Sequence, residues 1–552
     1  MRVSPFVALV GLVGLAACGA SDLGAVEGPS NDGGVDAAHD GASPTDAAIA
    51  DAAIDVFDAA VDAVDASDAR DASDAAADGG LPATVTPGAV DRILLIGTVI
   101  TPDVSFDGQV LVEGSVITCV APALGCQGQV GAVGATIIDT HGVIAPGLVD
   151  THNHILFDIF DDSDWLPAQA YTNHKGWPAE PRYQAMLDVK QCLEDASQGK
   201  PAWCPATYDG VNSLKCEMDK WGELKGLIAG TTSIVGLAGT TSACFGSLAR
   251  TIDASQNGLG QDKIQTSALF PPSKSAADGV CANFATTKTD AYLIHVGEGT
   301  DPAALAELAK LGTASTTEGC LYAPQTVITH GTAFTSAEFM QMAAANMKLT
   351  WSPASNVALY GSTTNIPAAL DANVTIALAP DWSMGGSQNL LDEMRFADAW
   401  DDAHFGNRLT PKAIVAMTTK NAASALALGG RIGTVEVGAL ADLMVVSRQP
   451  ADPYAAILAA RPKDVRLTMI GGRVLYGDAA LKAAAPALPG CEDLAICGTP
   501  KFLCVAETTA TTKLDQTYAQ IKAILEAAMT DVDALTPDGY DFTPLAPLVK
   551  CN

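Results

Sequence analysis

Short apolar runs separated by polar, glycine-rich and proline-rich breaks dominate the chain from about residue 90 onward. Between residues 146 and 435 these runs alternate with helix-like segments, a pattern typical of parallel strands that are buried on both faces. Eight strands are expected in this region: GLVDTHNHI, TTSIVG, LARTID, IQTSALF, AYLIHVG, QTVITHG, MKLTWSP and VTIALAPD. Eight strands alternating with helices predict an α/β fold, namely a (β/α)8 barrel of the TIM type.

Two stretches that flank the predicted barrel have a different hydrophobic pattern, because their β-rich runs are short and are broken by Gly, Pro and Asp. They cover residues 86–145 and 436–482, and we expect them to form one small composite β-sandwich domain. Residues 483–552 contain several cysteines and a helical pattern over Leu514–Ala534. We therefore interpret them as a helical C-terminal appendix.

The first 85 residues predict export. Arg2, an apolar run over Phe6–Ala17 and the small residues before Cys18 form a signal peptide, residues 1–18, whose end resembles a bacterial lipobox. An ordinary secretory signal with a chance cysteine is the alternative. Residues 19–85 are rich in Ala and Asp and predict a disordered tether. We expect an exported protein that meets a bacterial membrane only through a lipidated Cys18, in the periplasm or on the outer-membrane surface.

Charge and cysteine usage narrow the class of function. The 552 residues include 63 acidic and 31 basic side chains, so nucleic acid is not an expected partner. Twelve cysteines follow Cys18 and none forms a CxxC pair, which in an exported protein predicts disulfides. The plausible pairs are neighbours in sequence: Cys119 with Cys126, Cys192 with Cys204, and Cys491 with Cys497.

Four of the eight histidines stand at the ends of predicted strands. His152 and His154 are two residues apart, so on a strand they point to the same face, and at the end of the first barrel strand that face is the active-site mouth. His295, His330 and Asp381 each end another apolar run. One such histidine is usually structural. Four in order, followed by an aspartate, predict a site for a first-row metal ion.

Glu298 adds a second kind of chemistry. It lies three residues after His295, so on a regular strand it would face away from the mouth, but Gly297 and Gly299 allow the backbone to turn it inward. A carboxylate beside a metal-activated water is suited to proton transfer. A solvated loop glutamate is the alternative interpretation.

Several segments together resemble the amidohydrolase superfamily and, within it, the cytosine-deaminase and chlorohydrolase-like branch: PGLVDTHNH, AGTTSIV, HVGEG, ITHGTAFTSAEF, SPASN, APDWSMGGSQNLLDEMRFA and GALADLMVV. The resemblance spans about Val90–Asp478. It implies that Glu298 is the proton shuttle and that His330 orients the attacking water or polarises the substrate. It also implies four ligands for one divalent metal, namely His152, His154, His295 and Asp381, with Asp381 accepting a hydrogen bond from the nucleophile.

Three features depart from the family pattern. Binuclear relatives carry a carboxylated lysine at the end of strand four, but IQTSALFPPSK offers Ser, Leu and Phe there and reaches Lys274 only later. One metal is therefore expected, zinc first, with iron or manganese as alternatives. The family's GTD before the last ligand reads APD, followed by Trp382. The loop after strand one is aromatic, which fits either stacking on a planar substrate or packing within the loop. Its His174 is interpreted as a surface histidine, with a contact to substrate as the alternative.

The sequence therefore predicts a metal-dependent amidohydrolase that acts on a small molecule outside the cytoplasm. Such an enzyme is a hydrolase of carbon–nitrogen bonds other than peptide bonds, by deamination or by hydrolysis of a cyclic or linear amide. The alternative is a catalytically inactive surface lipoprotein that binds a metal or another ligand. No oligomeric state follows from the sequence.

Overall fold

A computed structural model describes residues 80–236, 248–253, 259, 263–267, 270–507 and 515–551. The predicted signal peptide, with Cys18, and residues 19–79 of the predicted tether lie outside the described residues. Within the described ranges, no helix combines the length and the apolar character that crossing a membrane requires.

Eight short parallel strands build the barrel, and they coincide with the eight that the hydrophobic pattern predicts. Three of them form a sheet in the order β6-β7-β8, and five form a sheet in the order β13-β12-β11-β10-β9. The predicted TIM-type α/β fold is thus confirmed. The strands are β6 (Leu148–Asp150), β7 (Thr231–Ile234), β8 (Arg250–Thr251), β9 (Ile264–Ser267), β10 (Ala291–Val296), β11 (Thr326–His330), β12 (Lys348–Trp351) and β13 (Thr375–Leu378).

The two barrel sheets meet just beyond the ends of β6 and β13. Asn153 and Asp381 form a parallel bridge there. The His154 N–H donates to the Asp381 carbonyl at 2.6 Å, and the Asp381 N–H donates to the His152 carbonyl at 3.2 Å. Among the described residues, no strand pairing joins β8 to β9. The backbone after the first strand and the backbone after the last are therefore fixed against each other.

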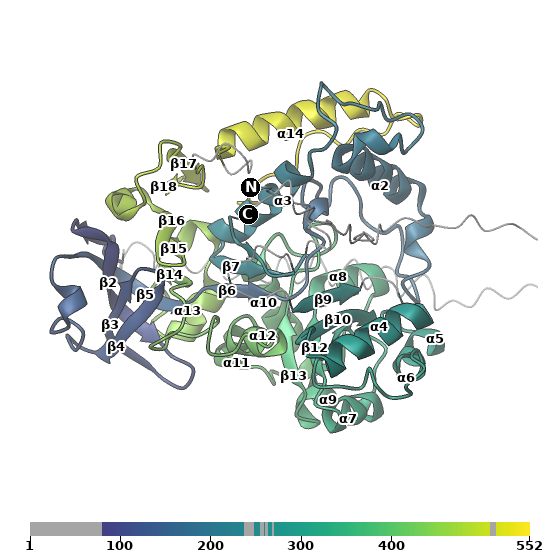
Figure 1. Cartoon of the computed structure of the whole chain (residues 1–552), viewed down its shortest axis with the longest axis horizontal. Coiled ribbons are helices and arrows are strands. Elements are labelled where there is room, and N and C mark those ends of the chain that lie inside the picture. Colours follow the sequence, from purple (N-terminus) through teal and green to yellow (C-terminus); the bar gives the residue numbers. More distant parts are fainter. Residues whose placement is uncertain are drawn as a thin grey trace, which may run out of the picture. The chain divides into compact units, whose positions relative to one another are not determined.

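In the described residues, helices lie between β6 and β7 and between each pair of consecutive strands from β9 to β13, and they cover the barrel strands (Figure 1). Strands such as β10 are buried along their whole length because both faces are covered. The helices are α2 (Pro181–Glu194), α3 (Lys215–Ile228), α4 (Lys274–Ala285), α5 (Pro302–Leu305), α6 (Glu307–Gly312), α7 (Ser336–Ala344), α8 (Pro353–Tyr360), α9 (Ile366–Asp371), α10 (Leu390–Trp400), α11 (Pro411–Met417), α12 (Lys420–Ala425), α13 (Pro453–Ala459) and α14 (Tyr518–Asp533).

Strands from both flanks of the barrel join in one ten-stranded sheet, in which β5 from the first flank pairs with β14 from the second (Figure 1). Apolar side chains from both flanks, such as Val110 and Val474, share one buried cluster. The strands are β1 (Thr84–Thr86), β2 (Ala89–Ile100), β3 (Ser105–Glu113), β4 (Val116–Pro122), β5 (Ala135–Pro146), β14 (Leu443–Ser447), β15 (Val465–Ile470), β16 (Arg473–Asp478), β17 (Glu492–Ile496) and β18 (Thr499–Leu503).

The C-terminal residues extend both parts of the fold. The hairpin β17–β18 adds to the sheet through pairing of β18 with β16. The predicted helix is α14, which contacts α3 and α2 on the barrel. Helix α3 is buried along nearly its whole length because α14 and strands of the ten-stranded sheet pack on it.

Disulfides staple loops and hairpins, and one of the expected pairs is wrong. Cys119–Cys126 and Cys192–Cys204 form as expected, and Cys281 pairs with Cys320. Cys491 pairs with Cys504 and Cys497 with Cys551, in place of the expected Cys491–Cys497 bridge. The reason is the β17–β18 hairpin. Its first strand separates Cys491 from Cys497 by about 3.3 Å per residue, whereas Cys491 and Cys504 flank the open end of the same hairpin.

Candidate active site

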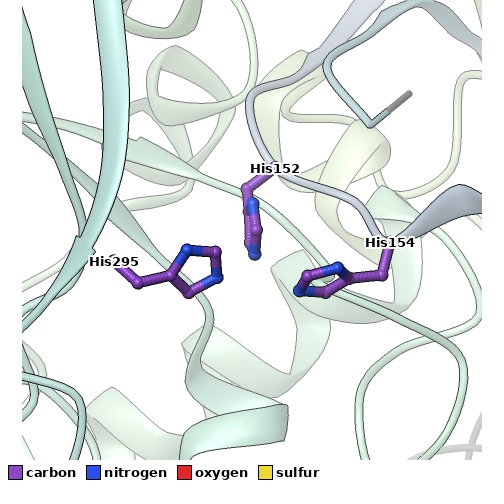
Figure 2. Close-up of side chains that lie close together, drawn as sticks. All are labelled: His152, His154 and His295. Carbon is purple, nitrogen blue, oxygen red and sulfur yellow. The ribbon is translucent and has the colours of Figure 1, made fainter. Parts of the chain in front are cut away.

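Three imidazoles converge at the carboxyl ends of the barrel strands (Figure 2). His152 and His154 lie just beyond the end of β6, and His295 is the fifth residue of β10. The ring centroid of His152 lies 4.9 Å from that of His154 and 4.7 Å from that of His295. The two-residue spacing and the strand end, both read from the sequence, thus bring these side chains together.

Asp381 brings a carboxylate to the same point from the other side of the barrel junction. Its Oδ1 lies 2.8 Å from Nε2 of His152 and 3.4 Å from Nε2 of His154. Nε2 of His152 and Oδ1 of Asp381 are both buried, yet neither makes a hydrogen bond within the described part of the chain. Two buried polar atoms that face each other without a hydrogen bond, with two more imidazoles beside them, fit a bound cation.

Burial keeps these imidazoles neutral. Desolvation lowers the pKa of His152, of His154 and of His295 to about 3 each. The short distance between His152 and Asp381 is therefore not an ion pair in the metal-free protein. The Nδ1 of His295 faces the Ser267 carbonyl at 3.4 Å, which leaves its Nε2 for the centre of the site. Neutral imidazole is the form that binds a metal ion.

Glu298 enters the site as the sequence predicts, from just past the end of β10. Gly297 and Gly299 have φ values of +72° and +141°, which turn the backbone back toward the mouth. A Cβ on Gly299 would meet the Thr172 carbonyl oxygen at 2.4 Å, so a side chain does not fit there. The carboxylate is buried, and this burial raises the pKa of Glu298 to about 7, although a hydrogen bond from Tyr360 opposes the rise.

His330 is the last residue of β11 and is fully enclosed. The amide oxygen of Asn356 accepts from Thr363 at 3.3 Å, so its Nδ2 donates to Nδ1 of His330 at 3.0 Å. A neutral His330 then carries its proton on Nε2, which lies 3.9 Å from Glu298 Oε1. His330 is thereby prepared to donate a hydrogen bond inside the site.

Backbone strain marks two of these positions. His330 and Asp381 have φ values of +73° and +68°, in the left-handed region that L-residues with side chains rarely adopt. Each such residue costs of order 1 kcal/mol and persists where the surroundings impose it, often at functional sites. The donor atoms of the site form three overlapping groups within 4.8 Å of one another: His152, His154 and His295; His152, His330 and Asp381; His295, Glu298 and His330.

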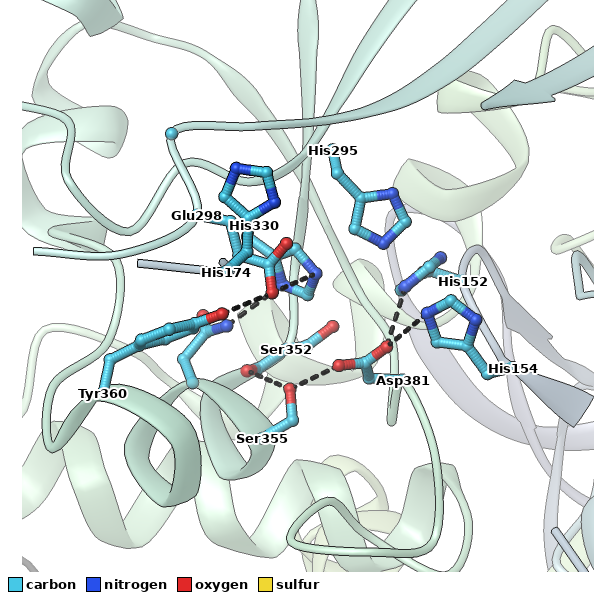
Figure 3. Close-up of polar contacts among 12 residues, drawn as sticks. His152, His154, His174, His295, Glu298, His330, Ser352, Ser355, Tyr360 and Asp381 are labelled. Atoms are coloured by element: carbon cyan, nitrogen blue, oxygen red, sulfur yellow. Dashed lines mark hydrogen bonds and ion pairs between the residues drawn. The ribbon is translucent and has the colours of Figure 1, made fainter. Parts of the chain in front are cut away.

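Helix α8 supplies supporting residues to which sequence reasoning gave no role. Ser355 donates to Oδ2 of Asp381 at 2.6 Å, Asn356 holds His330, and Tyr360 donates to Oε1 of Glu298 at 2.6 Å (Figure 3). One eight-residue helix thus contacts three polar groups of the site. The segment SPASN was noticed only as a resemblance. The signal that marks Tyr360 is its position four residues after Asn356, on the same helix face.

The aromatic side chains that follow β6 pack on one another and on Trp382. Trp382, which follows Asp381, is buried against the rings of His154 and Trp177, with centroid distances of 5.5 and 5.4 Å. Trp165 and Tyr183 pack in the same cluster. Of the two roles that the sequence left open, these contacts favour loop packing, which holds His154 and the loop in place.

The prediction for His174 is wrong. Its side chain is only 16% exposed, and its Nε2 contacts Glu307 at 3.0 Å. Its backbone N–H also donates to the Glu298 carbonyl at 3.2 Å. The alternation of polar and aromatic residues in this loop did not reveal that the loop folds over the segment carrying Glu298. Lys274 lies at the exposed start of α4, seven residues after β9 ends, in the loop position expected from the sequence.

A cavity of about 90 Å³ opens at this mouth. His152, His154 and His295 line it, together with residues at or just beyond the ends of β7, β8 and β9, among them Gly236, Asp253 and Ser267. The volume holds about three water molecules at ~30 Å³ each. The site therefore has space for water beside the imidazoles.

The lowered histidine pKa values predict how the metal-free protein responds to acid. Unfolded histidines protonate near pH 6.5, whereas buried His152 and His154 resist protonation down to about pH 3, so stability falls as the pH drops through this window. In a His152→Ala/His154→Ala variant, the slope of unfolding free energy against pH between pH 5 and 4 should fall by about two protons. Urea unfolding across this pH range measures it.

His174→Ala is the matched control for that experiment. Its hydrogen bond to Glu307 raises the pKa of His174, so this residue is protonated in both states between pH 5 and 4 and its removal should leave the slope unchanged. An unchanged slope in the double variant would contradict neutral burial of the two imidazoles.

Comparison with known proteins agrees with this geometry. Residues 281–475 match the amidohydrolase family. The chain is 27% identical over 425 residues to 5-methylthioadenosine/S-adenosylhomocysteine deaminase of Syntrophobacter fumaroxidans, covering 70% of this chain and 93% of that protein. It is 24% identical over 398 residues to 5'-deoxyadenosine deaminase of Methanothermobacter thermautotrophicus, covering 68% and 90%.

Solved structures show the same fold. The adenosine deaminase of Xanthomonas campestris, with bound zinc, superposes with a TM-score of 0.54 and 18% identity over 69% of this chain and 92% of that one. Atrazine chlorohydrolase from Arthrobacter aurescens, complexed with zinc, gives a TM-score of 0.52 and 15% identity over 72% and 96%. The family match covers about a third of the chain, and the curated relatives resemble most of it. The solved structures show that the fold is shared.

Proposed function

We propose that the protein is a metal-dependent hydrolase that cleaves a carbon–nitrogen bond of a small molecule, using an activated water. The observation that carries the proposal is the convergence of three neutral imidazoles and one carboxylate at the barrel mouth, with Glu298 and His330 beside them. The curated relatives that match most of the chain are named as deaminases, which makes loss of an amino group the first reaction to consider.

His152, His154, His295 and Asp381 are the proposed ligands of one divalent metal ion, with zinc as the first candidate. A donor set of three nitrogens and one oxygen suits zinc, and also iron or manganese. Bound in this site, such an ion supplies Lewis acidity that lowers the pKa of a water molecule toward neutrality. Ser355, which donates to the second oxygen of Asp381, would hold that carboxylate in a fixed orientation.

The proton path is assigned to Glu298 and His330. Glu298, whose pKa is raised to about 7 by burial, can accept a proton and release it near neutral pH. In the proposed reaction it takes a proton from the attacking water, a carbon–oxygen bond forms, and the proton passes to the leaving nitrogen as the carbon–nitrogen bond breaks. His330, with its proton on Nε2, donates to the substrate atom that gains negative charge.

A Glu298→Gln variant tests this assignment. Because the amide cannot shuttle a proton, its rate of ammonia release should fall by about 10²- to 10⁴-fold. Its metal content should match that of the wild type, since Glu298 is not a proposed ligand. The measurement is ammonia release from aminated nucleosides and purine bases by metal-loaded protein, with metal content determined on the same samples.

Two outcomes would contradict the proposal. Full activity of Glu298→Gln would show that another group moves the proton. A metal-loaded wild-type protein that hydrolyses neither aminated rings nor cyclic or linear amides would favour the alternative, a surface protein that binds a metal or ligand without catalysis.

We also propose that the protein works outside the cytoplasm, anchored through Cys18. The lipobox-like end of the signal peptide supports this, and so do the five disulfides between described cysteines, because such bridges persist in oxidising compartments. Mass spectrometry of the protein extracted from membranes should find Cys18 as a lipid-modified N-terminus. A soluble protein that retains residues 1–17 would contradict the anchor.

A further inference from the structure

The two carboxylate oxygens of Glu298 have unequal surroundings. Oε1 accepts the hydroxyl of Tyr360 at 2.6 Å and lies 3.9 Å from Nε2 of His330. Within the described part of the chain, no hydrogen bond reaches Oε2. Tyr360 therefore holds Oε1 of Glu298, whereas Oε2 remains available to accept a proton in the site (Figure 3).

The backbone of Glu298 is fixed independently of its carboxylate. The Gly297 N–H donates to Glu307 at 2.8 Å, and the carbonyl of Glu298 accepts from the N–H of His174 at 3.2 Å. Gly299 forms a bridge with Asn173. These contacts place the Cα atom, but rotation about the side-chain bonds of a glutamate still moves its carboxylate through several rotamers. Only a contact at the carboxylate itself removes that freedom.

Tyr360 is itself rigid enough to provide this contact. It ends helix α8, is 4% exposed, and its Oη accepts the indole N–H of Trp177 at 3.1 Å. Because that indole donates to Oη, the hydroxyl proton is free to point to Glu298. Burial raises the pKa of Tyr360 well above its usual value, so the hydroxyl remains a donor. Asn356, one turn earlier, anchors the same helix to His330.

We propose that Tyr360 is a positioning residue, which holds Oε1 of Glu298 so that Oε2 faces the nucleophile and the leaving group. This inference rests on the proposed function, because it takes Glu298 as the proton shuttle. Tyr360 acts through Glu298 and need not touch the substrate. Trp177 extends the contact to the loop after β6, so the same Tyr360 hydroxyl links that loop to the carboxylate of Glu298.

The test compares Tyr360→Phe with wild type in two measurements on the metal-loaded protein. In steady-state hydrolysis, the variant should lose about tenfold or more in kcat while KM changes less than about twofold, because misplacing a reacting group impairs the chemical step more than binding. In a crystal structure of the variant, the Glu298 carboxylate should leave its position or occupy more than one, with the metal site unchanged.

Tyr171→Phe is the matched control. It deletes a tyrosine hydroxyl that donates to Glu180 at 2.6 Å in the loop after β6, so it should keep wild-type kcat and the wild-type position of Glu298. A Glu298 that stays in place in Tyr360→Phe, or a loss that appears in KM alone, would overturn the inference. If wild type hydrolyses nothing, the proposed function fails, and the position of Glu298 in the variant crystal still decides whether Tyr360 holds it.

Discussion

The backbone pairing between the ends of the first and last barrel strands is the constraint on which the site depends. Two hydrogen bonds, from His154 to Asp381 and from Asp381 to His152, tie the segments together where their side chains must meet. The pairing sets the carboxylate 2.8 Å from an imidazole nitrogen and fits the left-handed backbone at Asp381. The same backbone hydrogen bonds therefore connect the two barrel sheets and bring Asp381 next to His152 and His154.

Without a bound cation, burying unpaired ligand atoms of His152 and Asp381 lowers the stability of the folded protein. Burial holds three imidazoles neutral, with the pKa of each lowered to about 3, beside a carboxylate whose Oδ1 makes no hydrogen bond among the described residues. Helix α8 offsets part of the cost by supplying Ser355, Asn356 and Tyr360 to three of the polar groups. A fold that maintains unpaired ligand atoms in its interior is one that bound metal would stabilise.

The sequence predicted those parts of the structure that depend on local periodicity. The eight barrel strands follow from apolar runs, and the positions of His152, His154, His295 and Asp381 follow from where those runs end. Contacts that depend on how distant segments fold together were not predictable. His174 looked like a surface residue because nothing local shows that its loop covers Glu298, and Cys491 was assigned the wrong partner because the β17–β18 hairpin decides which cysteines meet. Tyr360 shares a helix face with Asn356, but its contact with Glu298 depends on segments that are distant in sequence and was likewise not predicted.

We propose that one divalent metal ion is held between side chains at the ends of the first, fifth and last barrel strands. Anomalous diffraction on both sides of the zinc absorption edge, from crystals of the zinc-loaded protein, tests it most directly. We expect one strong peak, about 2.0–2.2 Å from a nitrogen of each of His152, His154 and His295 and from an oxygen of Asp381. A second peak of similar height in the same mouth, or no peak between these four side chains, would contradict it.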